Sequence, residues 1–312
     1  PRLGVEAVAR TANLSLSNLT AEQVAHQIAP RLNAPGRFGN GRAALELLLT
    51  DSPAEAGRLA RELNEANERR RALETQIAQE AETLVIASGR TERRAIVLGS
   101  RHWHPGVLGI VASRISSRYQ LPVVLVAFDE TGLGRGSARA GEGCQLIPAF
   151  EACREHLLRF GGHQTAAGLL IEERQFEPFA NRFEVAIPGV DVRRGPEPLL
   201  IDALVSLNEL DGRLVSGLEK LQPFGQGNPA PLFATCGVKI LANSCQELRG
   251  GHLRLTVREG ARVHTAIGFG MADRISELSK TDSVDIVFTP QLDTWHGETS
   301  IRLRLKDIRR AT

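Results

Sequence analysis

The chain has 312 residues, which at about 150 residues per domain predicts two compact units or three small ones. It is 42% hydrophobic and 24% charged without a biased tract, which excludes fibrous, collagen-like and wholly disordered proteins. No apolar run approaches the roughly 20 residues that span a bilayer, and no signal-peptide pattern begins the chain, so we expect no membrane or secreted protein. Four cysteines without a Cys-x-x-Cys pair favour reduced thiols and a cytoplasmic location.

The formal charge is nearly balanced at +2, but only four of the 38 cationic side chains are lysines. Arginine presents a planar fork that binds phosphate oxygens through two hydrogen bonds at once, so this bias fits a nucleic-acid or nucleotide partner. GC-rich coding also favours arginine, so composition alone does not decide. The first residue is Pro1 rather than an initiator Met.

The first half of the chain predicts helices. Residues 1–50 form short helical patterns broken by a loop at 30–37, which holds two prolines, a glycine and two arginines. Residues 51–88 begin with a capping-box signal and keep apolar residues at helical spacing. A helix of that size is roughly 45 Å long, so we predict a long helix that connects two units.

Residues 93–187 alternate β-branched runs with helical patterns, which predicts an α/β domain. We expect strands at 94–98, 122–128, 135–140 and 167–172, and helices at 107–119, 146–159 and 175–186. A segment rich in Pro and Gly at 188–196 predicts a linker.

Residues 198–312 are rich in strand patterns. A helix at 271–279 before the fourth of five strands is the layout of an OB-fold barrel, a fold that often binds single strands. The five strands are expected at 233–241, 252–258, 262–269, 283–290 and 299–308. The predicted fold class is therefore α/β plus β, with a long connecting helix, an α/β domain and a five-stranded OB barrel.

Three segments suggest binding chemistry. The first is Phe-Gly-Gly-His-Gln-Thr-Ala-Ala-Gly at 160–168, after the helix expected at 146–159. The backbone N–H groups of Gly161 and Gly162 could approach an anion, to which His163 could also donate. The alternative interpretation is that the glycines only cap the helix.

The second segment is Gly-Arg-Gly-Ser-Ala-Arg at 134–139. On a strand, Arg135, Ser137 and Arg139 share one face, and a hydroxyl between two guanidinium groups suits a phosphate. The alternative is a solvated strand face.

The third segment, at 102–107, precedes a helix whose first turn favours anions. A metal site at His102 and His104 is the weaker hypothesis, because the pair lacks an acidic partner.

Together these segments resemble the DHH-associated domain of the RecJ exonucleases. The resemblance rests on Gly-Gly-His-x-x-Ala-Ala-Gly at 161–168, Gly-Ser-Ala-Arg at 136–139 and His-Pro-Gly-Val-x-Gly-Ile-Val-Ala-Ser-Arg at 104–114. The segments 29–37, 221–229 and 294–297 are similar to the stretch before that family's long helix and to its OB domain. The motifs follow the family's order across essentially all 312 residues.

The resemblance implies a processive, metal-dependent 5′→3′ exonuclease that acts on single-stranded DNA in recombination and repair. Such enzymes hold Mn²⁺ or Mg²⁺ in a DHH phosphoesterase domain. This sequence has no His-His pair and no Asp-x-Asp. We therefore expect the metal ligands and catalytic residues upstream of residue 1, with residues 1–50 forming the tail of the DHH domain. The chain would then be part of a longer exonuclease and inactive alone.

The resemblance also assigns binding roles by position. Residues expected at the substrate phosphate or along the entering strand are Ser137, Arg139, Gly161, Gly162, His163, Arg37, Arg31 and Asn33. In the OB domain, Arg254 and Arg258 are expected to contact DNA, with Arg262 extending their basic track. Phe233, Phe269 and Trp295 are candidates to stack on bases; the alternative for the two phenylalanines is a place in the core. Ala140 stands where the family usually has Ser, which removes one hydroxyl contact.

The implied partners are single-stranded DNA and, in the family, a single-strand-binding protein or a helicase; a monomer is expected. Two alternatives remain. One is a relative that cuts short oligonucleotides or cyclic dinucleotides, although such relatives generally lack an OB domain. The other is a nucleic-acid-binding module without nuclease activity, like the related domain appended to alanyl-tRNA synthetase.

Overall fold

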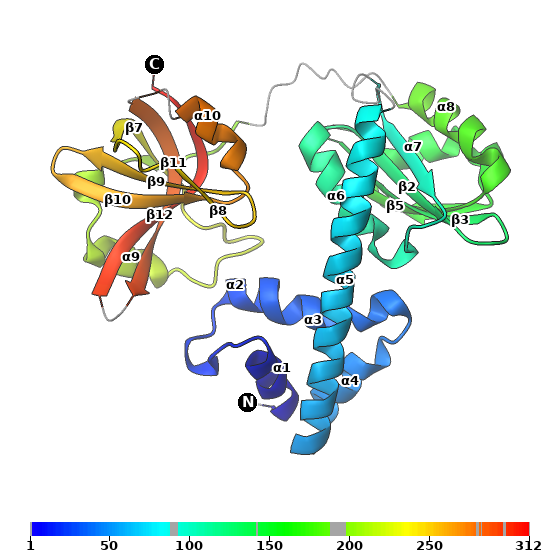
Figure 1. Ribbon diagram of the computed structural model, residues 1–312, viewed down its shortest axis with the longest axis horizontal. Helices are drawn as coiled ribbons and strands as arrows, with labels where there is room; N and C mark the ends of the chain where they lie inside the picture. The colour runs from blue at the N-terminus through cyan, green and yellow to red at the C-terminus, as the bar shows by residue number, and fades with distance from the viewer. Residues whose placement is uncertain are drawn as a thin grey trace. The chain divides into compact units, whose positions relative to one another are not determined.

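The computed structural model describes residues 2–87, 93–141, 143–187, 198–278, 281, 283–295 and 298–311, without the side chains of residues 18, 294 and 295. The chain divides into two compact units, Pro1–Pro196 and Glu197–Thr312 (Figure 1). The linker predicted at 188–196 lies outside the described residues. Among the helices that are described, none is long and apolar enough to cross a membrane.

A helical lead-in begins the first unit. Thr20 forms a capping box with Gln23, in which each residue accepts a hydrogen bond from the other's backbone N–H. A hydrophobic core that includes Val8, Leu47 and Leu63 joins these helices to the start of the long helix. The helices are α1 (Leu3–Thr11), α2 (Ala21–Gln23), α3 (Ala29–Asn33) and α4 (Arg42–Leu49), with a 3₁₀ turn η3 (Pro35–Phe38) before α4.

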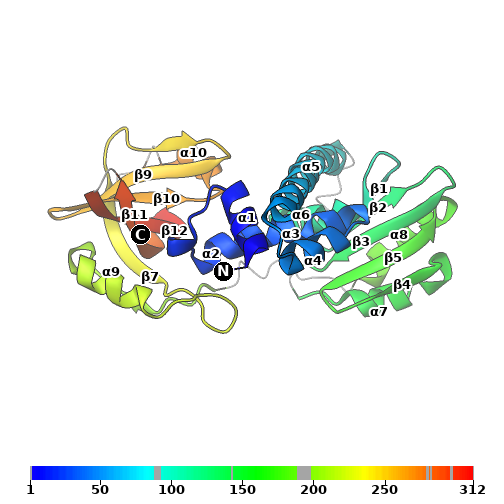
Figure 2. The same cartoon turned by 90° about the horizontal axis from the view of Figure 1, so that it is seen from below.

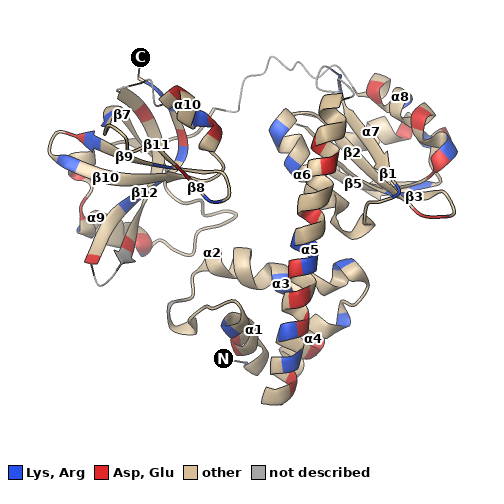
Figure 3. Cartoon of the chain, viewed as in Figure 1, with Lys and Arg blue, Asp and Glu red and all other residues tan. Residues whose placement is uncertain are grey.

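The long helix α5 (Pro53–Ala87) confirms the predicted connecting helix. Acidic and basic residues are interspersed along its first half (Figure 3), and several form ion pairs three or four residues apart. Its buried side chains fall into two groups. Leu59 and Leu63 pack into the lead-in, whereas Ile77 and Val85 pack into the α/β domain. One continuous helix therefore belongs to both cores and fixes the distance between them.

The α/β domain is built on a five-stranded sheet in the order β1-β2-β3-β5-β4. Only β1 and β2 are parallel. Alternate residues of β2 enter different cores: Leu125 packs with α5 and α6, and Val124 packs with α7 and α8. The elements are β1 (Ile96–Ser100), η5 (Pro105–Val107), α6 (Leu108–Tyr119), β2 (Val123–Phe128), β3 (Leu133–Arg139), α7 (Leu146–Glu151), β4 (Arg159–Gly162), β5 (Ala166–Glu172) and α8 (Phe176–Ala186).

Strand β4 corrects the sequence prediction. The helix expected over 146–159 ends at Glu151, and the glycines that follow form an edge strand paired with β5. Phe160 anchors this strand, because its ring lies 5.8 Å from that of Phe150 in the core. A run with two glycines carries no strand pattern, so tertiary pairing decided the structure here. The interpretation of Gly161 and Gly162 as a helix cap, or as following a helix, is wrong.

The second unit has the strand order of an OB fold. Its five long strands pair cyclically as β7-β11-β12-β10-β9, and β9 pairs back to β7. Two short strands, β6 and β8, extend the sheet beyond the five predicted, and a shared core fills the interior. The elements are β6 (Ala203–Leu204), α9 (Gly212–Glu219), β7 (Phe233–Ile240), β8 (Gln246–Leu248), β9 (His252–Glu259), β10 (Arg262–Gly268), α10 (Ile275–Leu278), β11 (Ser283–Trp295) and β12 (Glu298–Arg310).

Trp103 ties the long helix to the α/β domain. Its ring is buried at 4% exposure, and its Nε1 donates to Glu80 Oε2 at 2.9 Å. Hydrogen bonds from Gln76 and Trp103 lower the pKa of Glu80, which keeps this carboxylate an acceptor.

We predict that Trp103→Phe lowers the free energy of unfolding by about 1–2 kcal/mol, because it removes this hydrogen bond and part of the packed ring. Urea unfolding monitored by circular dichroism measures the change. Tyr119→Phe is the control, since the Tyr119 hydroxyl makes no hydrogen bond within the described ranges. Equal stability of the two variants would contradict the role of Trp103.

Candidate nucleic-acid interface

Three neighbouring strands of the α/β sheet align small residues in one row. Ser137 of β3 lies opposite Gly168 of β5, and Gly168 lies opposite Gly161 of β4. Opposed residues on paired strands share a face of the sheet. A Cβ at Gly161 would meet nothing within 4 Å. Beyond Ser137 this one row is therefore bare backbone out to the edge of the sheet at β4, which Figure 2 shows at the border of the domain.

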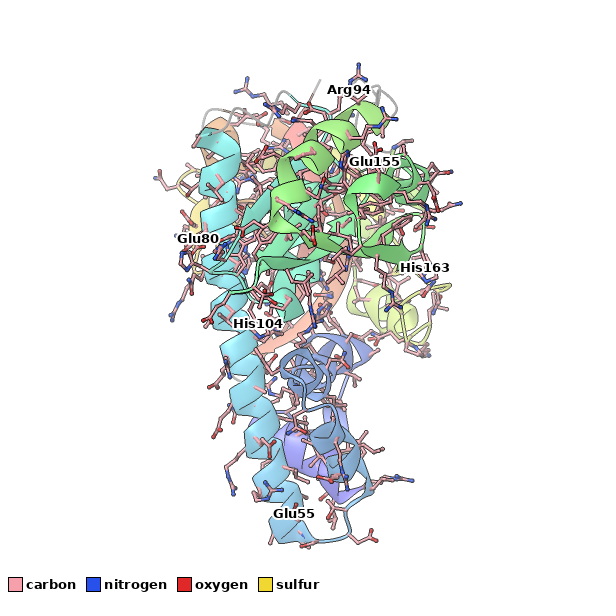
Figure 4. The ribbon with its side chains drawn as sticks, turned by 90° about the vertical axis from the view of Figure 1, so that its right-hand side faces the viewer. Glu55, Glu80, Arg94, His104, Glu155 and His163 are labelled. Atoms are coloured by element: carbon pink, nitrogen blue, oxygen red, sulfur yellow. The ribbon has the colours of Figure 1, made fainter. Side chains whose placement is uncertain are left out.

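An adjacent row carries charged and polar groups. Arg139 lies opposite Ala166, whose carbonyl accepts the backbone N–H of His163 at 2.8 Å. Because paired strands lie about 4.8 Å apart, His163 is two strand spacings from Arg139 along this row. His163 is exposed, and in Figure 4 it lies away from the long helix. The fold thus brings the predicted Ser, Arg and His motifs, far apart in sequence, into two adjacent rows.

Gly162 closes the β4–β5 hairpin. Its φ is +145°, and a Cβ there would lie 2.4 Å from the Ala166 carbonyl oxygen. Glycine is required here by the turn itself. The structure therefore gives Gly162 a conformational role, and its predicted contact with an anion stays a prediction.

Arg139 is held by two serines. Its Nη1 donates to Ser137 Oγ at 3.1 Å and to the Ala138 carbonyl at 2.7 Å, while its Nε donates to Ser113 Oγ at 3.0 Å. The sequence predicted the first serine but not Ser113, which lies on α6. The sequence signal for Ser113 was its position in the motif segment 104–114, on the helix that lies above β3. Helix α6 and strand β3 together form the candidate phosphate site.

The Arg37 loop is clamped against the start of α6. Arg37 Nη1 donates to the Gly106 carbonyl at 3.0 Å, and a Cβ on Gly106 would lie 2.2 Å from the Arg37 carbonyl oxygen. Beside this contact, the ring centres of Phe38 and His104 lie 5.2 Å apart. The guanidinium of Arg69 lies 4.8 Å from the centre of the Phe38 ring. The lead-in, α5 and the α/β domain meet here, and they place Arg37 at the candidate site.

Arg37 and Arg139 are close enough to repel each other. Burial, and then the charge of Arg37, lower the pKa of Arg139. Burial and Arg70 lower the pKa of Arg37, and Glu74 partly opposes them. Arginine stays protonated at any physiological pH, so the result is concentrated positive charge rather than a neutral group. Such a half-buried cluster suits a phosphate.

Arg31 and Asn33 lie in the lead-in. Arg31 Nε donates to Asn64 Oδ1 at 2.9 Å, and its Nη1 donates to the Gln27 carbonyl at 2.7 Å. The bond to Asn64 braces α3 against α5, and burial followed by the charge of Arg71 lowers the Arg31 pKa. Asn33 is exposed. Contact of these two residues with a strand stays a prediction.

The histidines at 102 and 104 do not form a metal site with other ligands. His104 Nδ1 accepts the Gly106 backbone N–H at 3.1 Å, and burial together with Arg69 lowers its pKa, which favours the neutral acceptor. His102 is exposed. Throughout the ranges that the structure describes, no group of three or more His, Cys, Asp or Glu side chains is placed to hold a metal ion.

One face of the OB sheet is basic. Arg254 and Arg258 are both exposed. They lie an even number of positions apart on β9, so they share one face of the strand. Arg262 lies opposite Glu259, which is next to Arg258 in sequence and therefore on the other face. The predicted extension of this track to Arg262 is wrong.

Strand β12 supplies cations that sequence analysis missed. Ile267 of β10 lies opposite both Arg254 and Arg304, so these two arginines share a face. Arg302, Arg304 and Lys306 stand at every second position of the strand. Arg302 Nη1 pairs with Asp293 Oδ2 at 2.9 Å. The signal was the strict alternation of Arg, Leu, Arg, Leu and Lys at 302–306.

The three aromatic residues proposed to stack on bases differ in position. Phe269 is 56% exposed, with His252 5.0 Å from its ring centre and the Arg304 guanidinium at 5.2 Å, so it lies on the basic face. Phe233 is 8% exposed in the core, so the stacking predicted for it is wrong. The side chain of Trp295 lies outside the described part of the structure.

Comparison with known families agrees with both units. Models of the DHHA1 domain and of the RecJ OB domain match residues 92–187 and 201–307. The chain belongs to the RecJ family. Both signatures occur in the order that the motifs predicted, and the resemblance proposed from sequence is confirmed.

Curated relatives share this assignment. The single-stranded-DNA-specific exonuclease RecJ of Thermus thermophilus is 35% identical over 93% of this chain and 40% of its own length. That of Escherichia coli K12 is 34% identical over 98% of this chain and 54% of its own length. The chain thus spans about half, or less, of the curated relatives that it matches.

Solved RecJ structures are similar in fold. A Thermus thermophilus RecJ in complex with Mn²⁺ matches with a TM-score of 0.81 and 31% identity, over 99% of this chain and 44% of that one. A second, in complex with Mg²⁺, has a TM-score of 0.79 and 30% identity, over 99% of this chain and 46% of that one. Across the described residues of this chain, no group of three or more His, Cys, Asp or Glu side chains is gathered as such an ion would require.

We predict that Gly106→Ala lowers the free energy of unfolding by about 2 kcal/mol or more, because the new Cβ overlaps a backbone oxygen that cannot rotate away. Thermal and urea unfolding measure the effect. Gly212→Ala is the control, since a Cβ there meets nothing within 4 Å. A Gly106→Ala protein as stable as the control would show that the clamp at Arg37 is loose.

Proposed function

We propose that this chain is the strand-holding part of a 5′→3′ exonuclease specific for single-stranded DNA, acting in recombination and repair. The observation that supports it most is the Arg37–Arg139 pair beside a bare, glycine-lined sheet surface. Two half-buried cations of like charge are stabilised by a phosphate between or beside them. Residues outside this chain would hold the metal ions, which would supply the activation of water for hydrolysis.

The residues present perform positioning. Ser137 and Arg139 are proposed to bind phosphate oxygens, which their hydrogen bond to each other supports, and the row of glycines leaves room for a strand backbone close to the sheet. Fixing a phosphodiester in this way converts binding energy into orientation without supplying a nucleophile. His163 at the end of the row is proposed to face a neighbouring phosphate.

The OB unit is proposed to hold DNA that has not yet entered. Its basic face contacts phosphates without reading bases, while Phe269 offers a stacking surface that tolerates any base. The RecJ OB domain argues against an enzyme that cuts only short oligonucleotides. A nucleic-acid-binding module without a nuclease partner is distinguished by the experiment that follows.

We predict that the chain binds a single-stranded oligonucleotide more tightly than its duplex. The logarithm of affinity should fall linearly with the logarithm of salt concentration, at about 0.7 per phosphate contact. Fluorescence anisotropy between low and moderate salt measures both, and gel analysis after incubation with Mn²⁺ should show an intact oligonucleotide.

Equal affinity for duplex, or affinity independent of salt, would contradict the strand-holding role. Degradation by a clean preparation would contradict the proposal that hydrolysis needs residues outside the chain. Tighter binding to RNA than to DNA of the same sequence would favour the alternative module.

A further inference from the structure

Helix α6 fixes the orientation of the Arg139 side chain. Ser113 Oγ accepts the Arg139 Nε–H at 3.0 Å and donates to the Gly109 carbonyl, also at 3.0 Å. The Ser113 hydroxyl proton is thus used in a hydrogen bond within α6. A lone pair of Ser113 Oγ remains to accept from Arg139. Ser113 therefore holds Arg139 in one direction rather than merely touching it.

The hydrogen bonds of Arg139 leave one edge of its guanidinium unused. Its five N–H groups comprise one on Nε and two on each Nη atom. Ser113 takes the first, and Ser137 and the Ala138 carbonyl accept from Nη1. Within the part of the chain that the structure describes, Nη2 makes no hydrogen bond and no carboxylate pairs with Arg139. Two donors remain for a ligand.

Gly109 leaves this edge accessible. A Cβ at Gly109 would lie 2.7 Å from Arg139 Nη2 and 3.1 Å from Ser137 Oγ. Ser137 Oγ accepts a hydrogen bond from Nη1, so its own proton is available to donate. The unused donors of both residues therefore adjoin the space where any side chain at 109 would stand.

We propose that Gly109 and Ser113 are positioning residues for phosphate binding: Ser113 aims Arg139, and the missing side chain at 109 admits a phosphate oxygen to Arg139 Nη2 and Ser137 Oγ. The ligand is a phosphate group of a single strand. This inference rests on the proposed function, because it assigns the phosphate contact to Arg139.

The first test compares Gly109→Ala with Gly57→Ala in the full chain. A Cβ at Gly57 meets only an arginine terminus at 3.7 Å. Both changes place a better helix former within a helix, so neither should lower the melting temperature. Gly109→Ala should weaken binding of 5′-phosphorylated hexathymidylate roughly tenfold and reduce the salt slope by about 0.7, equivalent to one phosphate contact. Gly57→Ala should change neither.

The second test removes the Ser113 hydroxyl. Ser113→Ala should weaken the same binding roughly threefold to tenfold, Ser113→Thr should restore it, and Ser117→Ala, one turn further along the exposed side of α6, should leave it unchanged. Rescue by threonine separates an oriented hydroxyl from a general requirement for a small side chain.

Arg139→Ala distinguishes failure of this inference from failure of the proposed function. Loss of binding in Arg139→Ala, with full binding in Gly109→Ala and Ser113→Ala, would overturn this inference and leave the proposed function standing. Unchanged affinity and salt slope in Arg139→Ala would overturn the phosphate site, and this inference with it.

Discussion

The candidate phosphate site of the first unit depends on two like-charged guanidinium groups that the fold holds at partial burial. Arg37 comes from the lead-in and Arg139 from the α/β sheet, and the lack of a side chain at Gly106 lets the start of α6 lie against the Arg37 backbone. The charge of Arg37 lowers the pKa of Arg139. Among the described residues, no carboxylate at Arg139 raises that pKa again. Such an arrangement persists only because the surrounding packing enforces it, and a bound phosphate would relieve it.

The long helix provides that enforcement. It contributes Leu63 to one core and Ile77 to the other, so the lead-in and the α/β domain cannot separate without exposing apolar surface. Trp103 secures its second half through Glu80. The candidate site is thus rigid in its supports and open at the glycine-lined strands, an arrangement suited to a strand that passes through rather than a ligand that is enclosed.

Sequence patterns predicted much of this organisation, and their failures have physical reasons. The capping-box signal at the start of residues 51–88 and the helical spacing that follows it located α5, and the β-branched runs located β1 and β2. Strand β4 was missed because Gly161 and Gly162 carry no strand propensity and are held by pairing with β5. Ser113 was missed because its place in the segment 104–114 does not by itself reveal that this helix residue faces Arg139 on a distant strand.

A double-mutant cycle of Arg37→Gln and Arg139→Gln tests the central claim most directly. The account predicts a repulsive coupling in the free energy of unfolding, about 0.5–1 kcal/mol at low salt, that shrinks as salt screens it. With saturating 5′-phosphorylated single strand, the coupling should change sign, because both arginines then bind the ligand. A coupling of zero in both conditions, or an attractive coupling without DNA, would contradict the account.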